Sequence, residues 1–244
     1  MLKNSIKKNS GSWRRRGVNF IPRNPSHILE GGAVTFSAGW FAQGHTVSLE
    51  FHSITPSKFI SKQGKNHPLL PSRNIRTESH LGSQKWIKIT NNSEKFINLT
   101  LSLIHPNLFT SGLLILKKLR KFKATKVTAK ERQSVYTGIA VVSNRETPPH
   151  RDSGGRPEWY DTLINYSGTG GNPRLQLNSL GMDLEYSTGM VVSFCGSILE
   201  HEVRHWGTSD QACHTHFMRE SVRKRFDVPP AGWVEQNMYL PGQT

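Results

Sequence analysis

The chain has 244 residues, of which 35% are hydrophobic, so it is long enough to bury one good core. Its two cysteines exclude a disulfide framework and a zinc-type cysteine spacing, and no apolar run reaches transmembrane length, so we expect no membrane partner. The formal net charge is +15, and residues 1–90 carry 14 basic against 3 acidic residues. This basic excess predicts either contact with a nucleic acid or a solvated tail.

Residues 1–85 are expected to form a basic, loosely ordered N-terminal region, because Ser, Asn, Gly, Pro and basic residues dominate there. AVTFSAGWF and TVSLEFHSI are its possible strands. The N-terminal residues lack an apolar signal core, so we expect an intracellular protein, and the run Arg14–Arg16 predicts a nuclear one. Residues 86–244 are expected to form the folded domain.

The segments that follow Trp86 are predicted as two strands, WIKIT and KFINLTLSLI, and then a helix, HPNLFTSGLLILKKLRKF. A partial apolar stripe favours packing of this helix on a sheet, and basic residues crowd its end, where the helix dipole favours cations. Contact of this basic end with phosphates is the alternative interpretation.

The remaining sequence is rich in short strand candidates separated by Gly and Pro turns. TGIAVVSNRE leads into a turn-like TPP, and RESVRKRF after the last strand is predicted as a short basic helix. Many short strands with frequent turns predict an α+β protein whose core is a cupin-like jelly-roll, a double-stranded β-helix, with supporting helices on one side. The strand candidates are YDTLINYS, PRLQLNSL, MDLEYS, MVVSFC, ILEHEVRH and QACHTHFM.

A metal site is predicted from His150 and Asp152 in TPPHRDSGG. Side chains at i and i+2 of an extended segment point the same way, so these two can chelate one ion. His201, in GSILEHEV, is favoured as the third ligand because it emerges on a new strand after the turn at Gly196. Two imidazoles and one carboxylate are the ligand set of non-haem Fe(II) oxygenases. His205, His214 and His216 are the competing third ligands.

The stretches SNRETPPHRDSGGRPEWYD, GMVVSFCGSILEHEV and ACHTHFMRESV together resemble the fungal branch of the TET/JBP-type Fe(II)/2-oxoglutarate dioxygenases. The resemblance covers roughly residues 105–240. It implies a DNA-modifying enzyme that oxidises 5-methylcytosine with Fe(II), 2-oxoglutarate and O₂. It also implies that His150, Asp152 and His201 hold the iron.

The family's 2-oxoglutarate-binding arginine lies about ten to eighteen residues beyond the distal histidine. Arginine suits this role because its guanidinium binds a carboxylate through two parallel hydrogen bonds. Gln211 lies within this window but offers no charge, and Arg219 is the next candidate. Arg204 and Arg145 are the weaker alternatives.

The substrate is expected to contact Arg156, Glu158 and Trp159, which follow the metal motif. Enzymes that act on a base extrude it and hold it by stacking, which Trp159 can provide, while Arg156 can reach a phosphate. The alternative for Trp159 is a core position. DNA is the expected partner, with RNA as an alternative.

Two rival functions stay open. Gln211 and the basic N-terminal region favour the first, a catalytically impaired jelly-roll that binds nucleic acid. The second is a 2-oxoglutarate oxygenase that acts on another substrate, such as a protein side chain.

Overall fold

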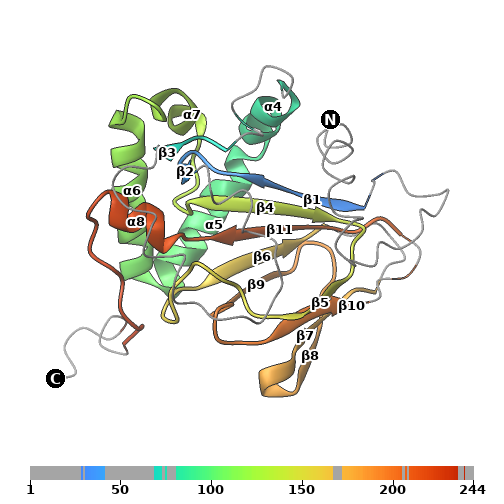
Figure 1. The fold of residues 1–244 in the computed structure, drawn as a ribbon. Coiled ribbons are helices and arrows are strands. Elements are labelled where there is room, and N and C mark those ends of the chain that lie inside the picture. The colour runs from blue at the N-terminus through green and yellow to red at the C-terminus, as the bar shows by residue number, and fades with distance from the viewer. Residues whose placement is uncertain are drawn as a thin grey trace.

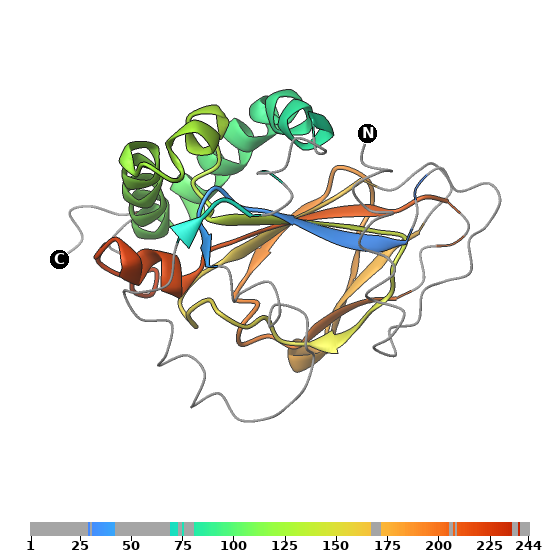
Figure 2. The same ribbon diagram turned by 45° about the horizontal axis from the view of Figure 1, so that its top comes forward.

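Two antiparallel sheets face each other in this protein, and helices lie together on one side of the larger sheet (Figures 1 and 2). This arrangement is taken from a computed structural model that describes residues 29, 31–41, 69–72, 75, 81–166, 172–204, 207, 209–235 and 239.

The larger sheet has five strands in the order β1-β4-β11-β6-β9, and each neighbouring pair is antiparallel. In this sheet no strand pairs with the strand that directly follows it in the chain, as expected where a strand array rolls up on itself. The strands are β1 (Gly32–Phe36), β4 (Gly138–Ser143), β6 (Asp161–Asn165), β9 (Val191–Phe194) and β11 (Ala212–Phe217).

The smaller sheet has four strands in the order β5-β10-β7-β8. From β4 to β11 the strands alternate between the two sheets, except that β7 and β8 both belong to the smaller one. This arrangement makes the core a double-stranded β-helix, as the sequence predicted. Side chains of both sheets meet in a buried cluster that includes Leu163, Leu175 and Phe194. The strands are β5 (Thr147–His150), β7 (Arg174–Leu177), β8 (Met182–Glu185) and β10 (His201–Arg204), and the short helix η4 (Asn178–Leu180) joins β7 to β8.

Strand β5 corrects one detail of the sequence interpretation. The segment TPP was expected to be a turn, but Pro148 and Pro149 lie inside β5. Proline cannot donate a ladder hydrogen bond, so it is confined to edge strands, and β5 is the edge of the smaller sheet.

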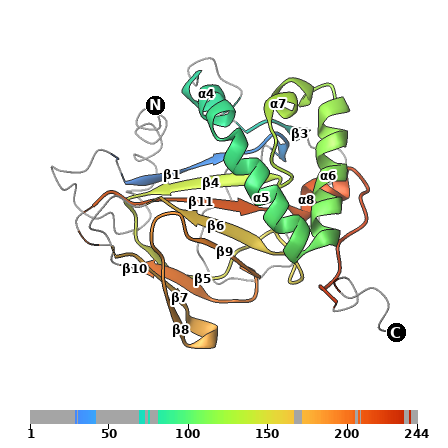
Figure 3. The ribbon, with the colours of Figure 1, turned by 180° about the vertical axis from the view of Figure 1, so that it is seen from behind.

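The segments WIKIT and KFINLTLSLI were predicted as strands, and this was wrong. They belong to helices α4 and α5, which lie across the face of the larger sheet that is turned toward the viewer in Figure 3. The alternation of apolar residues in KFINLTLSLI resembles a strand, yet only Ile97 and Leu101 are buried, whereas Leu99 and Leu103 are exposed. Burial at i and i+4 is the pattern of one helix face.

The helix predicted over HPNLFTSGLLILKKLRKF is present, and so is the short basic helix near the C-terminus. His105 ends one helix and caps the next, because its side chain accepts a hydrogen bond from the N–H of Leu108. None of the helices in the described ranges is long and apolar enough to cross a membrane. The helices are α4 (Leu81–Ile89), α5 (Asn91–Ile104), α6 (Pro106–Lys121), α7 (Lys126–Glu131) and α8 (Glu220–Arg225).

Strand β1 comes from the segment that the sequence interpretation assigned to the N-terminal region. It pairs with β4 along its whole length, from Gly32 opposite Ser143 to Phe36 opposite Ile139. The main sheet therefore begins well before residue 86. Two short strands, β2 (Trp40–Phe41) and β3 (Leu69–Leu70), form a separate pair, and the other possible strand, TVSLEFHSI, lies outside the described residues.

A buried ion pair fastens α5 to the larger sheet. Glu94 Oε1 lies 2.9 Å from Nε2 of His216 on β11, and both side chains are buried. Burial raises the pKa of Glu94, but the charges of His216 and Arg132 and the hydrogen bond to His216 outweigh it, so the pKa falls below its ordinary value. A lowered carboxylate pKa means that Glu94 stabilises the fold at neutral pH and loses this effect as the pH falls into the acidic range.

We predict that Glu94→Ala lowers the free energy of unfolding at neutral pH by about 3 kcal/mol, because it leaves His216 buried without its carboxylate. Urea denaturation followed by circular dichroism measures this change, and the loss shrinks at acidic pH. The neighbouring exposed Lys95→Ala serves as control and changes stability by less than about 0.5 kcal/mol. Equal stabilities for the two variants would contradict the role given to this pair.

Candidate metal centre

Strand pairing brings the predicted metal-binding residues together. His150 ends β5 and His201 begins β10, and the two residues are direct partners across this antiparallel pair. Asp152 follows two residues after His150, and its backbone N–H donates to the carbonyl of Gly196, 2.8 Å away, in the loop before β10. The chain on both sides of the site is therefore held by backbone hydrogen bonds.

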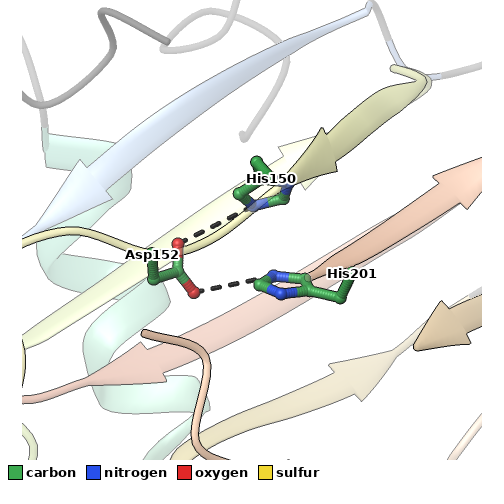
Figure 4. A group of neighbouring side chains, drawn as sticks. All are labelled: His150, Asp152 and His201. Carbon is green, nitrogen blue, oxygen red and sulfur yellow. Dashed lines mark ion pairs between the residues drawn. The ribbon is translucent and has the colours of Figure 1, made fainter. Parts of the chain in front are cut away.

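The three side chains point toward one another (Figure 4). His150 Nε2 lies 3.7 Å from Asp152 Oδ1, and His201 Nε2 lies 3.6 Å from Asp152 Oδ2. One potential ligand atom from each residue falls within 4.8 Å of the others. Among the described residues, no other His, Cys, Asp and Glu side chains form such a group.

Backbone carbonyls fix the tautomer of both histidines. Nδ1 of His150 lies 2.9 Å from the carbonyl of Pro148, and Nδ1 of His201 lies 2.9 Å from that of Leu199. A carbonyl oxygen only accepts, so each Nδ1 carries a hydrogen, and each Nε2, on the side of Asp152, is the atom that would bind a metal from the neutral ring. Burial, followed by the proximity of His201, lowers the pKa of His150 and favours its neutral form. Neutral imidazole is the form that binds metals.

The site opens into a cavity of about 170 Å³ between the two sheets. Alternate residues of β11 line it, namely Cys213, Thr215 and Phe217, as the two-residue period of a strand requires. Ala33 and Thr35 of β1 also line it. The sequence interpretation did not name either as a site residue, although AVTFSAGWF was a possible strand and alternate side chains of a strand share one face.

The buried Asp161 and the partly buried Arg219 lie next to Asp152 in this cavity. Burial, and then the nearby carboxylate of Asp152, raise the pKa of Asp161 well above its ordinary value. The guanidinium of Arg219 counters this effect, and its Nη1 lies 3.4 Å from the carbonyl of Ser153. A Cβ on Gly196 would lie 2.5 Å from Asp161 Oδ2 and 2.7 Å from Asp152 Oδ2, so only glycine leaves room for both carboxylates.

Three of the four candidates for binding 2-oxoglutarate, Arg219, Gln211 and Arg145, line the cavity at different places. Arg204 is not among the lining residues; it is exposed and pairs with Glu202. Arg219 follows β11 and interacts electrostatically with Asp152 and Asp161. Gln211 precedes β11, and its backbone N–H donates to Oδ1 of Asn144, directly before Arg145. Gln211 and Arg145 therefore lie at the opposite end of β11 from Arg219.

The predicted substrate-binding residues lie beside the cavity rather than in its wall. Trp159 is 3% exposed and its Nε1 donates to the carbonyl of Ala231, so it is a core residue and its ring cannot stack on a substrate. Arg156 pairs with Glu158 at 2.9 Å and with Glu220 at 3.5 Å, which ties the loop after the metal motif to α8.

The competing histidines do not join the group. His214 and His216 alternate with the cavity-lining residues of β11 and face the helices instead. His214 packs against Trp86 and Tyr166, and His216 pairs with Glu94. His205 lies outside the described residues.

Two imidazoles and a carboxylate facing one side of a cavity fit a ferrous ion, because this donor set leaves coordination positions open for other ligands. Two arginines in the same cavity, the buried Arg145 and the partly buried Arg219, fit an anionic cosubstrate. A double-stranded β-helix with this site defines an oxygenase of the Fe(II)/2-oxoglutarate-dependent class.

Comparison with known families agrees with this class. The family model Tet_JBP, the oxygenase domain of the 2OGFeDO superfamily, matches residues 60–220. The chain therefore belongs to the Tet_JBP family of Fe(II)/2-oxoglutarate-dependent oxygenases, which use Fe(II), 2-oxoglutarate and O₂. No curated protein sequence is significantly similar to it.

Solved structures show partial likenesses. The structure of NgTET1 in complex with 5mC DNA has 12% sequence identity and a TM-score of 0.48, and the match covers 70% of this chain and 62% of that one. A cupin 2 conserved barrel domain protein from Salinispora arenicola CNS-205 has 14% identity and a TM-score of 0.27, with 37% and 69% covered. The aligned part thus spans less than two thirds of NgTET1.

We predict that Gly196→Ala weakens Mn(II) binding by about tenfold or more, because the added methyl group displaces the Asp152 carboxylate. Isothermal titration calorimetry measures the affinity. Gly232→Ala is the matched control, since a Cβ there meets nothing within 4 Å. Unchanged Mn(II) affinity in a folded Gly196→Ala variant would show that the position of the Asp152 carboxylate does not depend on the absence of a side chain at residue 196.

Proposed function

We propose that this oxygenase hydroxylates the methyl group of a methylated nucleobase, and that its substrate is 5-methylcytosine in DNA. The observation that carries the proposal is the His150–Asp152–His201 group facing a cavity in a member of the Tet_JBP family. The motif resemblance to 5-methylcytosine oxygenases and the strongly basic chain support the choice of DNA. Nuclear localisation remains a prediction.

In this proposal His150 and His201 hold the iron through Nε2, and Asp152 holds it through its carboxylate. Bound Fe(II), together with 2-oxoglutarate and O₂, supplies the oxidation of an unactivated C–H bond. The chain's own contribution is to fix these ligands through the β5–β10 pairing and the Nδ1 contacts, and to keep the cavity between two packed sheets.

We further propose that Arg145 binds the far carboxylate of 2-oxoglutarate, with Gln211 beside it. Arg219 already faces two carboxylates, those of Asp152 and Asp161. Burial is what lowers the pKa of Arg145, and an anionic ligand would offset the cost of that buried charge. Arg145 therefore supplies the positive charge that Gln211 lacks. This favours an active enzyme over a catalytically impaired nucleic-acid binder.

The opposite end of the cavity is the proposed entrance for the base. Ser153 and Gly155, in the loop directly after Asp152, line it together with Met218. Gly154, between them, has φ +91°, and a Cβ there would lie 2.5 Å from Nη1 of Arg219, so glycine lets this loop approach the arginine closely. A base extruded from the stack would reach the metal centre past this loop.

The substrate assignment predicts that the protein converts 5-methylcytosine in duplex DNA to 5-hydroxymethylcytosine when supplied with Fe(II), ascorbate and 2-oxoglutarate. Mass spectrometry of the digested DNA measures the product. His201→Ala, which removes one proposed ligand, forms no product under the same conditions. Absence of product from protein with iron demonstrably bound would remove 5-methylcytosine as the substrate, and succinate release with other methylated bases or RNA would redirect the search.

The cosubstrate assignment predicts that Arg145→Gln weakens 2-oxoglutarate binding by about 10-fold to 100-fold, the usual effect of losing a hydrogen bond to a charged group. Calorimetry with Mn(II)-saturated protein measures binding without turnover. Arg145→Lys keeps the charge but not the paired donors, so we expect an intermediate affinity. The assignment is wrong if Arg145→Gln binds normally and Arg219→Gln does not.

A further inference from the structure

Exposed lysines gather on the last turns of α6, the connection after it and α7. Residues 106–131 contain seven basic residues and a single acidic one, Glu131. Five of these lysines, which we call the helical basic surface, are exposed and form no ion pair with any residue that the structure describes. They are Lys117, Lys121, Lys123, Lys126 and Lys130. Glu131 is paired with Lys88 of α4.

Helix stability does not explain this arrangement. Lys117 and Lys121 are four residues apart on α6, as are Lys126 and Lys130 on α7, and like charges at this spacing destabilise a helix. Lys126 also begins α7, whose first turn has no acidic residue, and the positive end of the helix dipole disfavours a cation there. The dipole favours only the lysines in the last turns. The lysines therefore repel one another and carry charge that an external anion would neutralise.

The helical basic surface is connected to the cavity through α6. A Cβ on Gly112 would lie 2.3 Å from Cε of Met218, so this helix directly contacts a cavity-lining residue. Lys117 and Lys121 follow five and nine residues later, which is about 8–14 Å further along the helix axis. This distance corresponds to a few nucleotide steps of about 3.4 Å along one strand.

Helix α8 forms a second connection between the cavity rim and the same surface. The N–H of Glu220 donates to the carbonyl of Gly154, in the loop after the metal motif. At the other end of α8, Nζ of Lys118 donates to the carbonyl of Phe226. Figure 1 shows α6, α7 and α8 side by side at one end of the sheets.

We propose that the helical basic surface binds the backbone phosphates of a nucleic acid a few nucleotides away from the one that enters the cavity. Phosphodiester groups are the ligand, so the contact does not depend on base sequence or methylation. Entry of the adjacent nucleotide into the cavity rests on the proposed function, whereas phosphate binding by the lysines does not.

The test compares two double variants of the full chain that lose equal charge. K117Q/K121Q removes two lysines of the surface, and K85Q/K95Q removes two exposed lysines from α4 and α5, behind the larger sheet. Fluorescence anisotropy measures binding to an unmodified DNA duplex across a salt series, without iron or 2-oxoglutarate. The result is therefore independent of any oxidation. Parallel series with the single strand and with RNA of the same sequence distinguish the forms of nucleic acid.

For K117Q/K121Q we expect the slope of log affinity against log salt to fall by about 1.8, because each lost phosphate contact removes about 0.9 on duplex DNA. For K85Q/K95Q we expect little change. The nucleic acid that shows the largest difference is the form that the surface fits. Mn(II) and 2-oxoglutarate affinities and the thermal unfolding midpoint report an intact fold. The midpoint of K117Q/K121Q changes little, because removal of a repulsive pair offsets the lost interaction of Lys121 with the helix dipole. Equal slopes for the two variants, or no binding by the wild type, would overturn the proposal.

Discussion

The candidate site depends on one register, the pairing of His201 with His150 across the antiparallel strands β10 and β5. A shift of one residue would turn one imidazole to the opposite face of the smaller sheet, since strand side chains alternate. The register is fixed on the other side of β10 as well, where four residues pair with β7 from Leu177 to Arg174. Proline at two positions of β5 confines that strand to the edge and prevents pairing beyond it.

The side chains of β11 also alternate between two faces, one that lines the cavity and one that packs against the helices. Cys213, Thr215 and Phe217 face the cavity, whereas His214 and His216 face the helical layer. Two histidines close in sequence to the proposed cosubstrate-binding residues thus serve the attachment of helices. The cavity in turn concentrates charge, since Asp152, Asp161 and Arg219 interact within it. Such a cluster is costly to bury, and its position beside the metal centre is consistent with a functional role.

The sequence was most informative where the pattern was local. Strands β6 to β11, helix α6 and the convergence of His150, Asp152 and His201 follow from turn signals and from the spacing of the motif. The sequence was misleading for α5. Leu99 and Leu103 alternate with buried apolar residues as in a strand, but both are exposed on the helix, and apolar residues are normally expected to be buried. Trp159 was predicted at the substrate site but lies in the core, because burial of a loop residue depends on the C-terminal segment that contributes Ala231. Likewise, only the fold places Arg145 and Arg219 at opposite ends of one cavity.

The central claim is that residues 150, 152 and 201 together bind a single ferrous ion. Anaerobic crystals of the full chain loaded with Fe(II) test this directly, through an anomalous difference map collected at the iron absorption edge. The account predicts one peak bonded to the Nε2 atoms of His150 and His201 and to a carboxylate oxygen of Asp152. A peak elsewhere, or an iron that lacks either imidazole, would contradict it.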